Sequence, residues 1–151
     1  MNSDLKLIVL SPAGPYGRES LGHETSIVTQ LFEEGLEIFH LRKPLWDQRS
    51  VCAFLQKIPN KYHARIVLHS CYRLVNDYDL AGFHLPEKIR NDFVNNPDGN
   101  EELYSLLNRS TKSLSSSLHL NPIDLSYFKA RLPIKDIDYL FCSPLCESIS
   151  K

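Results

Sequence analysis

The segment Glu37–Pro44, EIFHLRKP, begins as a buried β-strand and ends in a cluster of basic side chains. Its first residues are mostly apolar, as in a strand that is covered on both faces of a parallel sheet. His40, Arg42 and Lys43 then follow within four residues, and a protein core does not tolerate such cations without partners. His40 and Arg42 share parity, so both can point to one face of the strand. The segment therefore predicts a strand over 37–41 that ends at a binding site.

Three further segments close a strand-like run on or next to a histidine. They are RIVLHS (Arg65–Ser70), GFHLPE (Gly82–Glu87) and SSSLHL (Ser115–Leu120). With the first segment, the apolar runs predict strands at 6–11, 37–41, 65–68, 82–85, 112–118 and 138–142.

Between these strands, apolar residues recur at helical spacing. Gly35 is placed as the stop of a helix around 25–34, Asp47 as the N-cap of the next helix, and Pro122 in the first turn of a helix that reaches about Arg131. Strict alternation of strands and helices predicts an α/β fold of parallel β/α units. In a barrel of such units the carboxyl ends of the strands converge on one face, where catalytic groups lie. The side chains expected on that face are His40, Arg42, His69, His84 and His119.

Length and composition indicate one ordinary globular domain over 1–151. The chain has 151 residues, of which 42% are hydrophobic and 23% charged. Its net charge of −1 argues against a nucleic-acid partner. The apolar run LIVL near the N-terminus is too short for a membrane span or a signal peptide. The four cysteines form no C-x-x-C pair, so we expect reduced thiols and a cytoplasmic protein that does not contact membranes.

The histidines differ in how strongly they indicate a site. Ser115, Ser117 and His119 share one face of a strand, and a polar face on a buried strand indicates a ligand pocket. His84 fits a structural and a functional role equally, whereas His69 and His63 fit a structural role better. A histidine metal site is an alternative. It is not favoured, because no strand end supplies a carboxylate and the nearest one, Glu87, lies two residues beyond its strand.

Taken in order along the chain, the motifs resemble the thiamine-phosphate synthase and thiazole tautomerase superfamily. They are HLRKP, GFHLPE, SSSLHL and DYLFCSPLCESISK (Asp138–Lys151), of which the last is the most specific. The resemblance covers nearly the whole chain and implies a (β/α)8 TIM barrel. Only about six β/α units are present, so we expect an incomplete barrel, truncated after strand six, with the chain ending inside a binding loop.

The resemblance implies substrate-binding roles after the second strand. His40 stands where the family has a glutamine, Arg42 matches its arginine, and Lys43 lies one residue before the position of its lysine. His69 and Ser70 stand at an Asn-Asp pair of the synthases, and a second synthase aspartate, after strand four, is missing. Those two aspartates hold Mg²⁺ in the synthases, so their absence disfavours synthase chemistry.

The resemblance to the tautomerase branch is more complete. Ser117, Leu118 and His119 match its Ser-x-His pattern, in which the histidine is the catalytic general acid and base. No cofactor is required for that chemistry, whereas a synthase would need Mg²⁺. Further substrate-binding residues implied by the resemblance are His84, Ser117, Ser148, Ser150 and Lys151.

The resemblance thus predicts an enzyme of thiamine biosynthesis that binds thiazole phosphate, with metal-independent tautomerase-like acid/base chemistry. Two alternatives stay open. The first is a thiamine-phosphate synthase, a transferase that joins hydroxymethylpyrimidine pyrophosphate to thiazole phosphate. The second is a non-catalytic protein that binds a thiamine precursor. The expected partners are thiamine precursors and a second copy of the chain in a homodimer.

Overall fold

The computed structural model describes residues 6–13, 18–96, 98–118 and 136–142. The chain divides into two compact units, Met1–Phe83 and His84–Lys151, and each is described by itself. The single domain expected over 1–151 stays a prediction. The helix predicted from Pro122 to about Arg131 lies outside the described residues.

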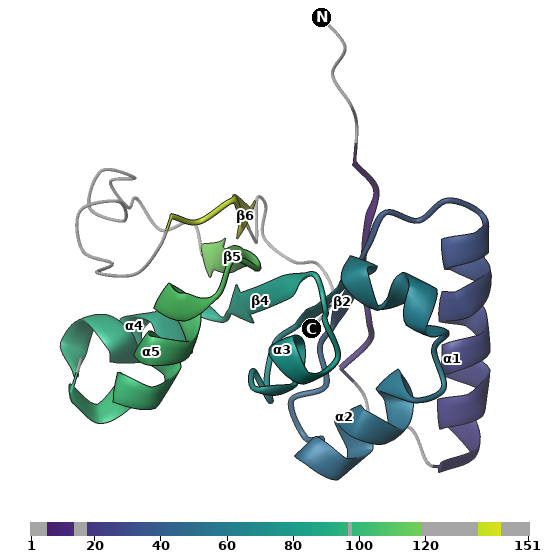
Figure 1. Ribbon diagram of the computed structural model, residues 1–151, viewed down its shortest axis with the longest axis horizontal. Coiled ribbons are helices and arrows are strands. Elements are labelled where there is room, and N and C mark those ends of the chain that lie inside the picture. The colour runs from purple at the N-terminus through teal and green to yellow at the C-terminus, as the bar shows by residue number, and fades with distance from the viewer. Residues whose placement is uncertain (1–5, 14–17, 97, 119–135, 143–151) are drawn as a thin grey trace, which may run out of the picture. The chain divides into compact units, whose positions relative to one another are not determined.

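Six strands form a parallel sheet in sequential order, and Figure 1 draws the described strands as arrows. They are β1 (Ile8–Leu10), β2 (Ile38–Leu41), β3 (Ile66–Leu68), β4 (Gly82–Leu85), β5 (Ser113–Leu118) and β6 (Tyr139–Cys142). The predicted strands are confirmed: β4 has the expected bounds, four strands are one residue shorter than expected, and β1 is three residues shorter. The order β1 to β6 never reverses, as it would in a doubly wound sheet. It is the order expected of a TIM-barrel-like fold, so the predicted fold class is confirmed.

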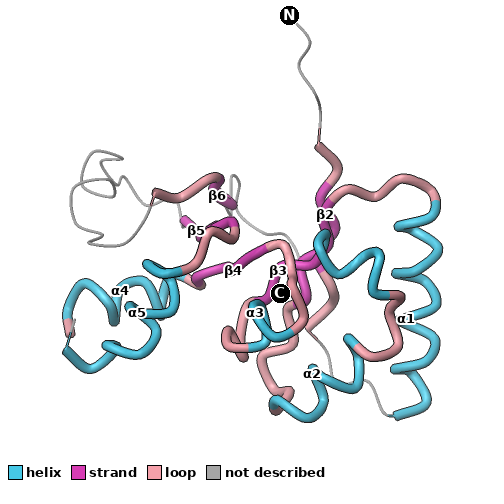
Figure 2. The backbone as a smooth tube through the Cα atoms, in the orientation of Figure 1, coloured by secondary structure: helices cyan, strands magenta, loops and turns pink. Residues whose placement is uncertain are grey.

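Helices alternate with the strands (Figure 2). The α-helices are α1 (Arg18–Glu33), α2 (Gln48–Leu55), α3 (Leu74–Asp77), α4 (Glu87–Asn95) and α5 (Glu101–Arg109), and two short 3₁₀ helices are η1 (Asn60–Arg65) and η2 (Asp98–Asn100). Within the described residues, no helix has the length and apolar character needed to cross a membrane.

Local signals explain where the first helices end. Asp47 caps α2, because its Oδ1 accepts a hydrogen bond from the backbone N–H of Ser50 at 2.8 Å. Gly35 has a φ of +101°, and Leu36 N donates to Leu31 O at 2.9 Å across it, which is the hydrogen bond of a Schellman motif. Both predicted boundaries are confirmed.

The predicted start of α1 is wrong by about seven residues, because the helix begins at Arg18 and not near Thr25. Threonine is a common N-cap, but here Thr25 Oγ1 donates to the carbonyl oxygen of Leu21 at 2.9 Å. This bond to the residue four positions earlier is typical of a threonine inside a helix.

The core of the first unit fixes which way β2 turns its side chains. The ring of Phe39 packs against Phe32 of α1, with 6.3 Å between centroids, and against Phe54 of α2, with 6.2 Å. Because successive strand residues point to opposite faces, His40 lies on the face away from these two rings. Its side chain is fully buried there.

Candidate active site

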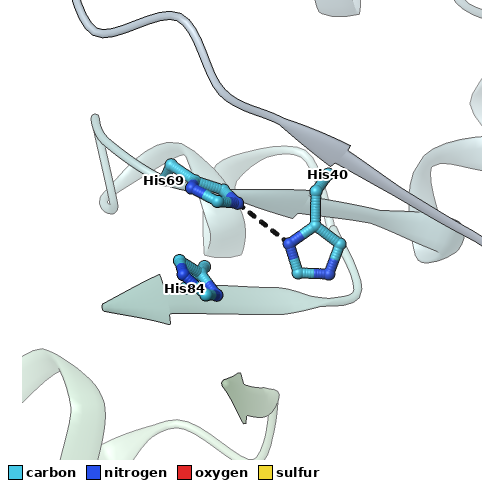
Figure 3. Close-up of side chains that lie close together, drawn as sticks. All are labelled: His40, His69 and His84. Atoms are coloured by element: carbon cyan, nitrogen blue, oxygen red, sulfur yellow. Dashed lines mark hydrogen bonds between the residues drawn. The ribbon is translucent and has the colours of Figure 1, made fainter. Parts of the chain in front are cut away.

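In the first unit the main polar contact at the strand ends joins two histidines. His40 Nδ1 lies 2.9 Å from Nε2 of His69, the residue that follows β3 (Figure 3). Both side chains are buried, with 0% and 8% of their surface exposed. One of the two nitrogens must carry a proton and the other must accept it. His69 thus has the hydrogen-bonded surroundings that the sequence predicted for it.

Ser11, the residue that follows β1, holds the backbone at the end of β2. Ser11 N donates to His40 O at 2.9 Å, and Arg42 N donates to Ser11 Oγ at 2.8 Å. Arg42 lies one residue beyond the end of β2, and its side chain is exposed. The loop therefore presents a fixed arginine to solvent, and the substrate-binding role of Arg42 stays a prediction.

Lys43, also predicted to bind substrate, is buried among protein groups. Its side chain is 1% exposed, and its Nζ lies 2.8 Å from Glu24 Oε2 on α1. The same ammonium group donates to Pro12 O at 2.9 Å and lies 5.1 Å from the ring centroid of Trp46. These contacts bind the loop after β2 to α1 and to the segment after β1. The structure thus gives Lys43 a structural role beside the substrate-binding role predicted for it.

In the second unit, a histidine forms hydrogen bonds with two serines of β5, the next strand along the chain. His84 of β4 places Nδ1 2.9 Å from Ser115 Oγ and Nε2 2.8 Å from Ser117 Oγ. A neutral imidazole has one donor and one acceptor, so one hydroxyl donates to the ring and the other accepts from it. His84 and Ser117, both predicted to be substrate-binding, are therefore brought together.

Two aromatic residues of β6 are paired with Ser115 and Ser117. The register pairs Ser115 with Tyr139 and Ser117 with Phe141, and the Phe141 ring lies 5.3 Å from the His84 ring. Burial raises the pKa of Tyr139, while a hydrogen bond with Ser115 opposes that shift. Ser115, His84 and Ser117 thus form one connected hydrogen-bond chain, and Tyr139 is paired with Ser115 in the strand register.

Arg90 of α4 contacts Ser116 and Ser117, and the sequence did not identify it as part of the site. Its Nη1 donates to the backbone oxygen of Ser117 and, at 3.2 Å, to Ser116 Oγ. Its Nη2 lies 3.5 Å from Glu87 Oε1. Burial lowers the pKa of Arg90, and Glu87 opposes that shift. The spacing of Glu87 and Arg90, three residues apart after Pro86, is the signal that could have identified them as a pair on one helix face.

The remaining predicted site residues cannot be placed. His119, Ser148, Ser150 and Lys151 lie outside the described residues, so their roles stay predictions. The described side chains form two clusters, one in each unit. The first is His40 with His69, and the second is His84 with Ser115 and Ser117. Figure 3 also labels His84, which belongs to the second cluster.

Comparison with known proteins supports the resemblance found in the motifs. No protein-family model and no curated protein matches the sequence. Among solved structures, the thiamine phosphate pyrophosphorylase from Bacteroides thetaiotaomicron matches with a TM-score of 0.65 and 33% sequence identity. The match covers 93% of this chain and 59% of that one, so the chain spans about three fifths of that protein. The predicted resemblance to the thiamine-phosphate synthase-like superfamily is thereby confirmed, in sequence and in fold.

Proposed function

We propose that this protein is a thiamine-biosynthesis enzyme that binds a thiazole phosphate and moves a proton within it. The observation that carries the pathway is the 33% identity to a thiamine phosphate pyrophosphorylase over 93% of this chain. The observation that favours proton transfer is the set of imidazole and hydroxyl groups at the described strand ends, namely His40, His69, His84, Ser115 and Ser117.

Coupling of a pyrophosphate substrate would need a hard cation held by oxygen ligands. The two positions that match the synthase aspartates carry other groups here. After β3, Ser70 stands at the aspartate and His69 at the asparagine before it, and His69 contacts His40 at 2.9 Å. After β4 the nearest carboxylate is Glu87, which faces Arg90 at 3.5 Å. Both observations support chemistry that requires no Mg²⁺.

Proton transfer requires a group that accepts a proton and returns it near neutral pH, which suits an imidazole. The resemblance assigns this step to His119, two residues beyond Ser117. We propose that His119 takes the proton from one ring position and delivers it to another, so that the aromatic tautomer forms. The neighbouring His84–Ser117 hydrogen bond, at 2.8 Å, would orient Ser117 toward the substrate.

The phosphate group needs cationic or donor groups. Arg42 is exposed after β2 and offers a bidentate donor. Ser148, Ser150 and Lys151 are assigned to the anion by the resemblance alone. In this proposal Lys43 stabilises the loop after β2, and Arg42 binds the phosphate.

A synthase is the second candidate, because the matched solved structure carries the name of a pyrophosphorylase. The experiment supplies the protein with both precursors, with and without a chelator, and measures thiamine phosphate. A parallel assay follows tautomerisation of the thiazole carboxylate phosphate. We expect tautomerisation that a chelator does not affect. Robust thiamine phosphate formation that the chelator abolishes would contradict the proposal, and ligand binding without turnover would indicate the non-catalytic binder.

A further inference from the structure

We propose that His40 and His69 together bind one divalent late transition-metal ion of the Zn²⁺, Co²⁺ or Ni²⁺ class. This site goes beyond the proposed function, which uses no metal. It lies within the first unit, and its two ligand atoms come from positions that the sheet itself holds in place.

The distance between the two ring nitrogens suits chelation. Nδ1 of His40 and Nε2 of His69 are 2.9 Å apart. A metal ion about 2.05 Å from both nitrogens would subtend an angle of about 90° at that separation. Tetrahedral coordination needs a separation of about 3.3 Å, which is an opening of about 0.4 Å. A small rotation about the χ angles of either side chain supplies that shift.

Strand pairing holds the backbone that carries the pair. His40 is paired with Val67 and Leu41 with Leu68 in the register of β2 and β3. His69 N donates to Leu41 O at 3.3 Å, which extends this pairing by one residue. Ligands on paired strands lose little conformational freedom when the ion binds, so the site is preorganised.

The chemistry of the donors selects the ion. Imidazole nitrogens suit Zn²⁺, Cu²⁺, Fe²⁺ and Ni²⁺, whereas Mg²⁺ and Ca²⁺ require oxygen ligands. In the hydrogen-bonded pair one of the two facing nitrogens carries a proton. That proton must move to the far nitrogen of the same ring, which gives the other neutral tautomer and frees both facing lone pairs for the ion. No net charge on the protein changes in this step.

The test titrates the metal-free full-length protein with Zn²⁺ alone by calorimetry, and with Co²⁺ by visible absorption. The variants are His40→Gln and His69→Gln, which keep a polar side chain at each position. The control is His23→Ala, because His23 is an exposed histidine of α1. We expect one equivalent of metal to bind to the wild type and to the control, and each glutamine variant to bind at least about 100-fold more weakly.

Thermal unfolding provides a second measurement that does not depend on turnover. A ligand that binds only the folded protein stabilises it, so Zn²⁺ should raise the Tm of the wild type and leave that of a folded glutamine variant unchanged. If one variant fails to fold, the other and the wild-type shift still decide. The proposal is overturned if the wild type binds no stoichiometric metal, or if the glutamine variants bind it as tightly as the control. Because binding is read directly, this outcome is independent of whether the protein is a tautomerase.

Discussion

Replacement of Lys43 by methionine should destabilise the first unit strongly. The substitution keeps the length and the apolar stem of the side chain but removes the ammonium group from Glu24 Oε2, 2.8 Å away, and from Pro12 O, 2.9 Å away. Removing one partner of a buried ion pair costs about 3–5 kcal/mol, because the other charge is left buried. Both carboxylate oxygens of Glu24 are buried, so the stranded charge regains little hydration. We therefore expect the free energy of unfolding to fall by about 3–5 kcal/mol.

Urea unfolding measures this change, with Trp46 as the reporter, because it is the only tryptophan in the chain. Its ring centroid lies 5.1 Å from Lys43 Nζ. The double variant Glu24→Gln/Lys43→Met should be more stable than Lys43→Met, since the stranded carboxylate is gone. Lys57→Met, at an exposed lysine, is the matched control. If Lys43→Met stays within about 0.5 kcal/mol of the control, the usual range for a surface change, the structural role of Lys43 is refuted.

Three further predictions concern single residues. Arg42→Ala should weaken binding of thiazole phosphate in calorimetry without loss of stability, because the side chain is exposed; unchanged affinity would show that Arg42 does not hold the anion. The hydrogen bonds from Ser50 lower the pKa of Asp47, so the cap stabilises α2 above the ordinary carboxyl pKa and loses this effect as the pH falls through the lowered value. The stability lost in Asp47→Ala should thus be larger at neutral pH than in strong acid, and an equal loss at both would contradict the charge contribution. Asp79, two residues beyond the end of α3, has a φ of +51°, so Asp79→Gly should leave stability unchanged or raise it by up to about 1 kcal/mol in urea unfolding, whereas a clear loss would argue against this backbone strain.

Local patterns in the sequence predicted most of the fold, because strands and helix ends depend on neighbouring residues. Apolar runs located all six strands, and Gly35 and Asp47 marked helix boundaries that the structure confirms. The structural reading of His63 also fits, since its ring nitrogen lies 3.0 Å from Leu55 O.

Long-range contacts were not predictable in the same way. Glu24 and Lys43 are joined by an ion pair that no spacing rule indicates, so the partners of Lys43 came only from the structure. Strand parity placed Arg42 beside His40, but β2 ends at Leu41 and strict alternation ends with it. Arg90 was missed because α4 itself was not predicted.

We propose that this protein transfers a proton through His119, the residue that follows β5 in the sequence. The most direct measurement compares the tautomerisation turnover of the wild type with that of His119→Asn, in the full-length protein. Asparagine keeps a hydrogen-bonding side chain of similar reach and removes the group that titrates near neutrality. We expect turnover to fall by about two to four orders of magnitude, with folding and substrate affinity retained. Near-normal turnover in the variant, or no tautomerisation by the wild type, would contradict it.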